Sequence, residues 1–500
     1  MPDRISRRQF IAAAAALGAA GCHLQRAEGI GAETGNRAPN FVMILSEAHG
    51  WSSTSVLSDP ARADSKSEVA QTPALTRLAE QGMRFSRAYA SSPRCTPSRA
   101  AILTGKSPAQ LHMTFVTDDG GTRRRPNAAA TPIVPPHCLL ELPESEMTVA
   151  ESLRAEGYAT AHFGKWHVGH ADPSRHGFDE SDGPTSNRGP GGNDKPNPLA
   201  AHEITDRGIA FARRQVQAGK PFYLQLSHYS ARNQEDVSPD VLDAFMKRTG
   251  ITDPRIASAH AAVEEMDTTI GKLLAALDEL KIADNTYVVY TTDHGTQGRN
   301  ENAPLSEGKG TLWEGGIRVP LIVRGPGIEA GSASTTPVIG HDFYPTFLDL
   351  AGSKEPLPKG VEGGSLRGVL NNGGTGAVKR PFDYFVFHFP HYDHDPNGPG
   401  TAIIAGNYKL IHFYETDKRL LFNLAEDIGE KRDLAAVEPE RTDTLARTMD
   451  EYLKAMSAQM PTRNAAASTG TSDVPQYQDR PRPPGKQKDE KKGGKRNAIR

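Results

Sequence analysis

The chain has 500 residues, of which 37% are hydrophobic and 24% are charged, and its formal net charge is −2 at pH 7. This length is too great for one small core and fits a large domain joined to a smaller one. The near-neutral charge argues against a general nucleic-acid-binding role, because such proteins gather a basic surface. We therefore expect a globular protein that has no nucleic acid among its partners.

Residues 1–36 are predicted to be an export signal and leader. Three arginines within the first eight residues precede an apolar stretch over 10–20, which is too short to span a bilayer. The run Ser-Arg-Arg-Gln-Phe at 6–10 is similar to a twin-arginine export signal. We expect an exported protein, periplasmic or at the cell surface, with no transmembrane span. Cys22 follows Ala-Ala-Gly and is a candidate for lipid attachment as a lipoprotein, although plain cleavage is the favoured outcome.

Buried strands and helices alternate in the larger part of the chain. The run Phe-Val-Met-Ile-Leu after Asn40 is continuously apolar, which is typical of a parallel strand covered on both faces. Apolar residues recur at helical spacing from Val263 to Leu277, and a β-rich run over 286–292 follows. This alternation predicts an α/β fold with a large, doubly wound, mostly parallel sheet.

Two acidic residues fall where such a sheet places its ligands. Glu47 follows the first of these strands, and Asp293 follows the strand over 286–292. Because ligands bind beyond the carboxyl ends of parallel strands, we expect both carboxylates to lie at one site.

The chain is predicted to form a catalytic domain over 37–370 and a smaller C-terminal α+β domain over 376–460. The run Asn-Asn-Gly-Gly at 371–374 is the expected linker between them. In the smaller domain, short antiparallel strands are expected at 382–389, 402–404, 409–414 and 419–423, and a helix at about 439–456. Residues 464–500 show no apolar periodicity and become rich in Pro, Lys and Arg, which predicts a disordered basic tail.

The most informative motif is the run Cys-Thr-Pro-Ser-Arg at 95–99, followed by Ala-Ala-Ile-Leu-Thr-Gly. Pro97 and Ser98 indicate a helix start, so Cys95 would face a helix N-terminus, where free N–H groups favour an anion. Taken alone, so short a run can also mark a buried structural cysteine before a helix.

This run resembles the signature of the type I sulfatases, in which the cysteine is oxidised to formylglycine. The resemblance implies that Cys95 becomes an aldehyde, whose hydrate attacks sulfur with one hydroxyl and expels the sulfate through the other. It also implies that Arg99 orients this nucleophile and that a formylglycine-generating maturation enzyme is a partner of the chain.

A second block, Gly-Tyr-Ala-Thr-Ala-His-Phe-Gly-Lys-Trp-His at 157–167, resembles the second sulfatase signature. Sulfate carries delocalised negative charge that grows on the leaving oxygen, so its transfer needs fixed cations and a proton source. The resemblance implies that Lys165 binds the sulfate and that His167 hydrogen-bonds the hydrated aldehyde and assists its collapse.

A third block combines Asp-His-Gly at 293–295 with a glycine-rich run at 308–320. It resembles the sulfatase stretch in which an aspartate and its neighbour bind calcium and a following lysine contacts the sulfate and the leaving group. The residues at those positions are Asp293, His294 and Lys309.

The metal ligands that the resemblance implies are Glu47, Asp293, His294 and an oxygen on the modified Cys95. Sulfatases usually carry two aspartates after the first strand, where this chain has Glu47 and Ala48. Calcium prefers six to eight oxygen ligands, and its affinity follows their charge. The family's asparagine is replaced by His294, so a softer divalent ion is the alternative to calcium.

The family also places a histidine that aids leaving-group departure after the strand at 222–227. The matching position here is Arg232, and arginine binds sulfate but does not deliver a proton at neutral pH. His228 either substitutes for that histidine or packs under the sheet. Arg232 and His228 join Lys165 and Lys309 as candidate substrate-binding residues.

The resemblance extends over about 40–460 and is nearest to the bacterial arylsulfatase and polysaccharide-sulfatase branch. It implies an alkaline-phosphatase-like fold and a sulfuric ester hydrolase that acts on a sulfated carbohydrate or an aryl ester. Two alternatives stay open. One is a phosphate or phosphonate ester hydrolase of the same superfamily, and the other is a catalytically impaired protein that binds sulfated glycans, which the residues at 47, 48 and 232 favour.

Overall fold

The computed structural model describes residues 37–118, 120–121, 131–187, 199–231, 236–297, 302–465 and 467. The helices and strands given below belong to one compact unit that begins at Ala38. The predicted export signal with Cys22, the candidate Arg232 and nearly all of the predicted tail lie outside the described residues.

A central sheet of eight strands has the order β10-β2-β9-β8-β1-β7-β5-β6. In that order the strands span Ser332–Ser334, Met83–Phe85, Leu321–Arg324, Thr286–Thr292, Asn40–Ser46, Phe222–Ser227, Ala159–Gly164 and Glu180–Ser181. Neighbouring strands are parallel except at β9, which runs antiparallel to β2 and β8. The prediction of a large, mostly parallel sheet is confirmed.

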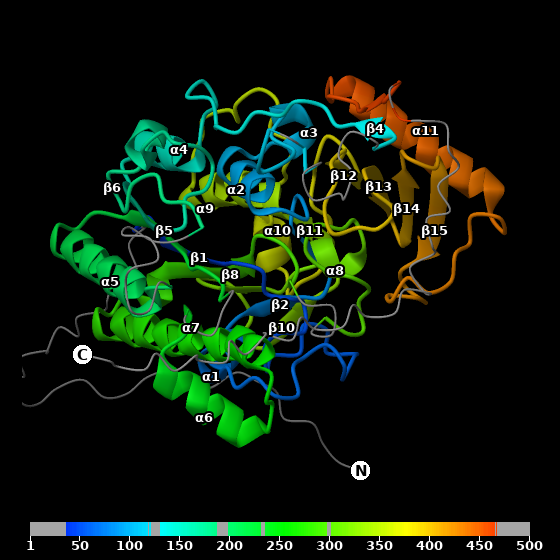
Figure 1. Cartoon of the computed structure of the whole chain (residues 1–500). Helices are drawn as coiled ribbons and strands as arrows, with labels where there is room; N and C mark the ends of the chain where they lie inside the picture. Colours follow the sequence, from blue (N-terminus) through cyan, green and yellow to red (C-terminus); the bar gives the residue numbers. More distant parts are fainter. Residues whose placement is uncertain are drawn as a thin grey trace, which may run out of the picture. The chain divides into compact units, whose positions relative to one another are not determined.

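Helices cover both faces of this sheet (Figure 1). One face carries α1 (Pro73–Glu80), α5 (Ala201–Gln217), α6 (Pro239–Thr249) and α7 (Pro254–Glu279), and the other carries α2 (Cys95–Thr104), α4 (Val149–Ala155) and α9 (Phe343–Ala351). On β1, Val42 and Ile44 pack into the first of these cores. Phe41, Met43 and Leu45 pack into the second, since successive side chains of a strand point to opposite faces. The continuous apolar run at 41–45 therefore serves two cores.

The apolar periodicity from Val263 to Leu277 belongs to α7, which is 26 residues long. Asp253 caps this helix by accepting a hydrogen bond from the Arg255 backbone N–H, and Pro254 occupies its first turn. Proline is well tolerated there because its missing N–H would have no partner within the helix.

A second sheet is an antiparallel meander of β12 (Tyr384–Phe389), β13 (Gly400–Ala405), β14 (Tyr408–Phe413) and β15 (Lys418–Asn423). Helix α11 (Pro439–Ala455) packs on it through a core that includes Met449, Leu453 and Ile403. The predicted smaller α+β unit is confirmed. Its first strand is shorter than expected, and its second extends further at both ends.

The remaining elements are short. They are β3 (Ala88–Tyr89) with β11 (Val338–Ile339), β4 (Ile133–Val134) with β16 (Thr462–Arg463), α3 (Pro108–Leu111), α8 (Glu314–Ile317), α10 (Arg367–Leu370), and 3-10 turns at Pro173–His176, Ala283–Asn285 and Gly340–Asp342.

The carboxyl ends of parallel strands deliver the candidate site residues to one edge of the central sheet. Ser46 of β1 is opposite Thr292 of β8, so Glu47 and Asp293 are the next residues on adjacent strands. Gly164 ends β5 with a φ of 95°, and a Cβ there would clash with the Ser227 carbonyl oxygen. Only glycine fits this left-handed, crowded position, which turns the chain into Lys165.

Candidate active site

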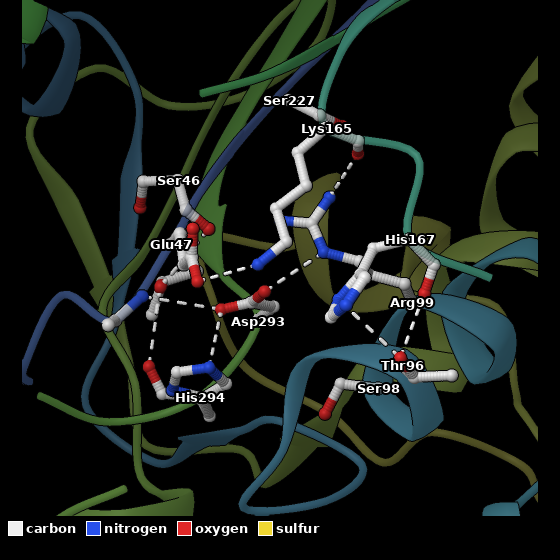
Figure 2. Close-up of polar contacts among 12 residues, drawn as sticks. Ser46, Glu47, Thr96, Ser98, Arg99, Lys165, His167, Ser227, Asp293 and His294 are labelled. Atoms are coloured by element: carbon white, nitrogen blue, oxygen red, sulfur yellow. Dashed lines mark hydrogen bonds and ion pairs between the residues drawn. The ribbon is translucent and has the colours of Figure 1, made fainter. Parts of the chain in front are cut away.

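Glu47 and Lys165 form a buried ion pair at the centre of the site (Figure 2). Lys165 Nζ donates a hydrogen bond to Glu47 Oε1 at 2.6 Å, and a second to Asn187 Oδ1 at 3.0 Å. The Ser230 backbone N–H donates to the other carboxylate oxygen of Glu47 at 3.3 Å. Asn187 had no signal in the sequence, because it belongs to none of the three motifs.

Cys95 is the first residue of α2 and is buried beneath the ends of the strands. The helix begins two residues earlier than the Pro-Ser pair suggested, because Pro97 lies within its first turn. Ser98 fixes the approach to the helix, since its hydroxyl donates to the Ser92 carbonyl at 2.8 Å and accepts from the Ser92 N–H at 3.0 Å. Residue 95 is thereby presented on an ordered helix N-terminus.

The charges around Cys95 favour an anion there. Burial raises the pKa of the thiol, but the ammonium groups of Lys165 and Lys309 and the contact with His167 more than offset this effect. Together they hold the pKa of the Cys95 thiol well below its usual range. The same cations would stabilise the negative charge of a bound sulfate.

Arg99 is enclosed within the site. Its Nε donates to Asp293 Oδ2 at 2.9 Å, and its NH1 donates to the Lys165 carbonyl oxygen at 2.6 Å. Arg99 therefore connects the helix of the nucleophile position to the ends of β8 and β5. Its predicted role in orienting the nucleophile stays a prediction.

His167 and Lys309 complete the surroundings of residue 95. The His167 carbonyl accepts a hydrogen bond from Thr96 Oγ1 at 2.9 Å, and burial lowers the pKa of the imidazole. Lys309 Nζ lies 3.7 Å from Glu47 Oε1, and burial lowers the pKa of its ammonium group. All five predicted catalytic residues are thus brought together, and their individual roles stay predictions.

The predicted metal ligands also converge. Donor atoms of Glu47, Cys95 and His294 all lie within 4.8 Å of one another, and Asp293 Oδ1 lies 3.3 Å from His294 Nε2. His294 Nδ1 donates a hydrogen bond to the Gly295 carbonyl oxygen at 2.9 Å, which orients the ring so that Nε2 faces the carboxylates. Two carboxylates and an imidazole beside residue 95 fit a divalent cation.

His228 lies at the end of β7, and among the described residues it makes no hydrogen bond to Cys95 or to the two lysines. Burial lowers the pKa of His228 to about 3, and the groups that act on it are His49 and His202. Neither of its ring nitrogens has a hydrogen-bond partner in the part of the chain that the structure describes. A role for His228 in substrate binding stays a prediction.

Residues that follow β12 of the small sheet also reach the site, and none of the three motifs includes them. Asp393 pairs with Arg94, the residue before Cys95, and His394 Nδ1 lies 3.0 Å from the Lys309 carbonyl oxygen. Both lie in the run His-Phe-Pro-His-Tyr-Asp-His at 388–394, which begins at the end of β12.

Comparisons with known proteins cover both sheets. Residues 39–353 match the family model described as Sulfatase, and residues 308–459 match the model described as N-sulphoglucosamine sulphohydrolase, C-terminal. A sulfatase of Formosa agariphila is 30% identical, over 84% of this chain and 89% of that protein. Human N-acetylgalactosamine-6-sulfatase is also 30% identical, over 84% of this chain and 86% of that protein.

Solved structures share the fold. Ps i-CgsB in complex with k-i-k-neocarrahexaose has a TM-score of 0.69 at 23% identity, over 83% of this chain and 93% of that chain. A protein solved with its substrate D-glucosamine-2-N,6-O-disulfate has a TM-score of 0.63 at 22% identity, over 84% of this chain and 98% of that chain. The arrangement of a large mixed sheet and a small antiparallel sheet is therefore shared with both.

Proposed function

This chain belongs to the sulfatase family, and we propose that it hydrolyses the sulfate ester of a sulfated carbohydrate through a formylglycine side chain made from Cys95. The observation that carries the proposal is the convergence of Lys165, His167 and Lys309 on the buried residue 95 at the start of α2. The cations around residue 95 are those that a bound sulfate would need, which supports a nucleophile for sulfate transfer at this position.

Once oxidised and hydrated, the side chain at 95 supplies a nucleophilic hydroxyl and a second hydroxyl that releases the sulfate. Lys165 and Lys309 would bind the sulfate oxygens and lower the cost of the charge that develops on them. Arg99 would hold Asp293 and the Lys165 carbonyl in place through its two hydrogen bonds. The chain would thus fix the cations before the substrate enters.

His167 would handle the proton at residue 95. Burial lowers the pKa of its imidazole, so the ring is neutral near pH 7 and has a lone pair available. A neutral imidazole beside a hydroxyl can accept its proton as a general base, and the imidazolium so formed can donate that proton again as a general acid.

We also propose that Glu47, Asp293 and His294, beside residue 95, hold a divalent cation, and that this cation is calcium. When bound, it would neutralise part of the sulfate charge and polarise a sulfate oxygen. The carboxylates support calcium, whereas the imidazole of His294 supports a softer ion.

A sulfated carbohydrate is the proposed substrate class. Its support is the similarity to N-acetylgalactosamine-6-sulfatases, which at 28–31% identity extends over most of this chain. Steryl-sulfatases are 27–28% identical, so a sulfated ring alcohol without sugar is the second class to assay.

Export to the periplasm or cell surface is proposed from the twin-arginine-like run alone. Among the described residues, no helix has both the length and the apolar character needed to cross a bilayer. The proposed route predicts that the chain moves out of the cytoplasm only when the arginines at positions 7 and 8 are present.

The test is co-expression of the full chain with a formylglycine-generating enzyme, followed by mass analysis of the peptide that contains Cys95. Sulfate release would be measured on sulfated galactosamine and galactan oligosaccharides, on a steryl sulfate and on an aryl sulfate, and phosphate release on an aryl phosphate. The proposal expects an aldehyde at position 95 and sulfate release that exceeds phosphate release. An aldehyde-bearing chain that releases phosphate but no sulfate would overturn it.

A further inference from the structure

The turn Asp393–Asp395 belongs to the connection between β12 and β13 of the small sheet, yet it contacts both segments that flank the nucleophile position. Asp393 binds Arg94, which directly precedes Cys95. His394 binds the backbone of Lys309. This turn, which belongs to the small sheet, therefore contacts two segments of the candidate site: the residue before Cys95 and the loop that carries Lys309.

The ion pair between Asp393 and Arg94 is bidentate and buried. Arg94 Nε and NH2 each donate to one carboxylate oxygen of Asp393. The Asp393 and Arg94 side chains are 0% and 7% exposed, respectively. These two bonds use one edge of the guanidinium and fix it toward the small sheet.

The same turn fits closely against the loop of Lys309. Gly310 has a φ of 76° and its N–H donates to the Pro93 carbonyl at 3.0 Å. A Cβ on Gly310 would lie 2.5 Å from Asp393 Oδ2, so the glycine lets the carboxylate approach. His394 Nδ1 lies 3.0 Å from the carbonyl oxygen of Lys309, the residue before Gly310, and this hydrogen bond holds the same loop at a second point.

The charges around residue 95 show what this ion pair prevents. Lys165 is paired with Glu47, and Arg99 is paired with Asp293. Arg94 is a further cation of this group, and the carboxylate that compensates it comes from the small sheet. Without Asp393, the guanidinium of the residue before Cys95 would lose its carboxylate partner, and a sulfate bound at residue 95 is the anion that we expect it to pair with instead.

We propose that Asp393 is a positioning residue of the sulfate site. It holds the Arg94 guanidinium away from the sulfate, and its turn fixes Lys309 beside the nucleophile. This inference rests on the proposed sulfatase function, and it assigns to the small sheet a part in the geometry of the reaction.

The test is the Asp393→Asn variant of the full chain, in the same state of maturation as the unchanged protein. We expect inorganic sulfate to bind about tenfold more tightly by calorimetry, because the released guanidinium adds a charge-assisted hydrogen bond. We expect kcat to fall about tenfold while KM does not rise, because the extra contact with Arg94 would hold the sulfur out of line with the attacking hydroxyl at residue 95. A loss of folding alone would not tighten the binding of sulfate.

Asp395→Asn is the matched control on the same turn. Asp395 accepts a hydrogen bond from Trp313 Nε1 at 3.1 Å, whereas the bidentate partner of Arg94 is Asp393. We expect this variant to leave the affinity for sulfate unchanged. If Asp393→Asn and Asp395→Asn have the same sulfate affinity as the unchanged protein, the proposal is overturned.

The double variant Arg94→Gln/Asp393→Asn keeps the proposal testable where Asp393→Asn does not fold, because it removes both charges of the pair and leaves no buried carboxylate without a cation. If the guanidinium is held away from the sulfate, this double variant binds inorganic sulfate with the affinity of the unchanged protein. A tenfold loss of sulfate affinity would show that Arg94 is a sulfate ligand, and would overturn the proposal. Calorimetry with sulfate needs no turnover, so a chain without hydrolase activity would refute the proposed function and still decide this inference.

Discussion

The carboxylate of Glu47 lies 2.6 Å from the ammonium group of Lys165, and neither side chain is exposed to solvent. The two residues follow β1 and β5, which are separated in the sheet only by β7. Glu47 also lies 3.7 Å from Lys309 Nζ. The carboxylate that the family resemblance assigns to the metal therefore also holds the two lysines assigned to the sulfate.

This ion pair gives a prediction for stability. Lys165→Gln leaves the Glu47 carboxylate buried without its closest cation, so we expect the free energy of unfolding to fall by about 3–5 kcal/mol. The double variant Glu47→Gln/Lys165→Gln removes both charges and should recover most of this loss. Urea denaturation of both variants measures the difference. Equal stability of the single and double variants would show that Lys165 does not compensate the buried charge of Glu47.

The sequence was sufficient to predict the fold class because its signals were long and repeated. The apolar run at 41–45 suits a strand between two cores, and both cores are observed. The convergence of Glu47 and Asp293 followed from the rule for strand ends, which the register of Ser46 against Thr292 obeys. Local pattern and topology agree at this edge of the sheet.

The contacts made by the small sheet could not be predicted in the same way. Asp393 and Arg94 are 299 residues apart in the sequence, and neither belongs to a repeating pattern of residues that would predict the contact. His388 and His391, from the same segment as Asp393, instead bind Thr401 and Thr114 in the interior. Which polar residues of this segment reach the site depends on tertiary packing, which no local pattern of the sequence encodes.

Cys95→Ala should abolish sulfate release. The variant loses the atom that becomes the nucleophile, so we expect turnover to fall by at least about a thousandfold. The melting temperature should change little, since a small side chain is exchanged for another. Cys138→Ala is the control, because Cys138 is only partly buried and lies outside the candidate site. Retention of more than a tenth of the activity in Cys95→Ala would contradict the assignment.

Ala48→Asp should tighten the binding of calcium. Ala48 has a φ of 56°, a backbone conformation that aspartate adopts more readily than alanine, and its N–H donates to Asp293 Oδ1 at 3.3 Å. A carboxylate there adds a charged oxygen ligand, so we expect calcium affinity to rise by about tenfold or more in a calorimetric titration. Ala48→Asn has the same size and backbone tolerance without the charge, and should give a smaller gain. No change in either variant would mean that residue 48 does not face the metal.

The stability of the protein should depend on pH through Asp395, whose carboxyl is buried near Trp313. Burial raises the pKa of Asp395 from 3.8 to about 6. Between these values the folded chain binds a proton that the unfolded chain has released, so the contribution of this group to stability falls as the pH rises from about 4 to about 6. The loss is at most about 3 kcal/mol, because a pKa difference of one between the folded and unfolded chains corresponds to about 1.4 kcal/mol.

Asp395→Asn removes this titration. The amide oxygen that the substitution introduces would still accept the hydrogen bond from Trp313 Nε1, which Asp395 now accepts at 3.1 Å. We therefore expect the variant to gain stability relative to the unchanged protein as the pH rises through this window, and the difference to be constant above it. Urea denaturation at pH values of about 4, 5, 6 and 7 would measure the difference. Parallel curves for the two proteins across this range would show that folding does not raise the pKa of Asp395.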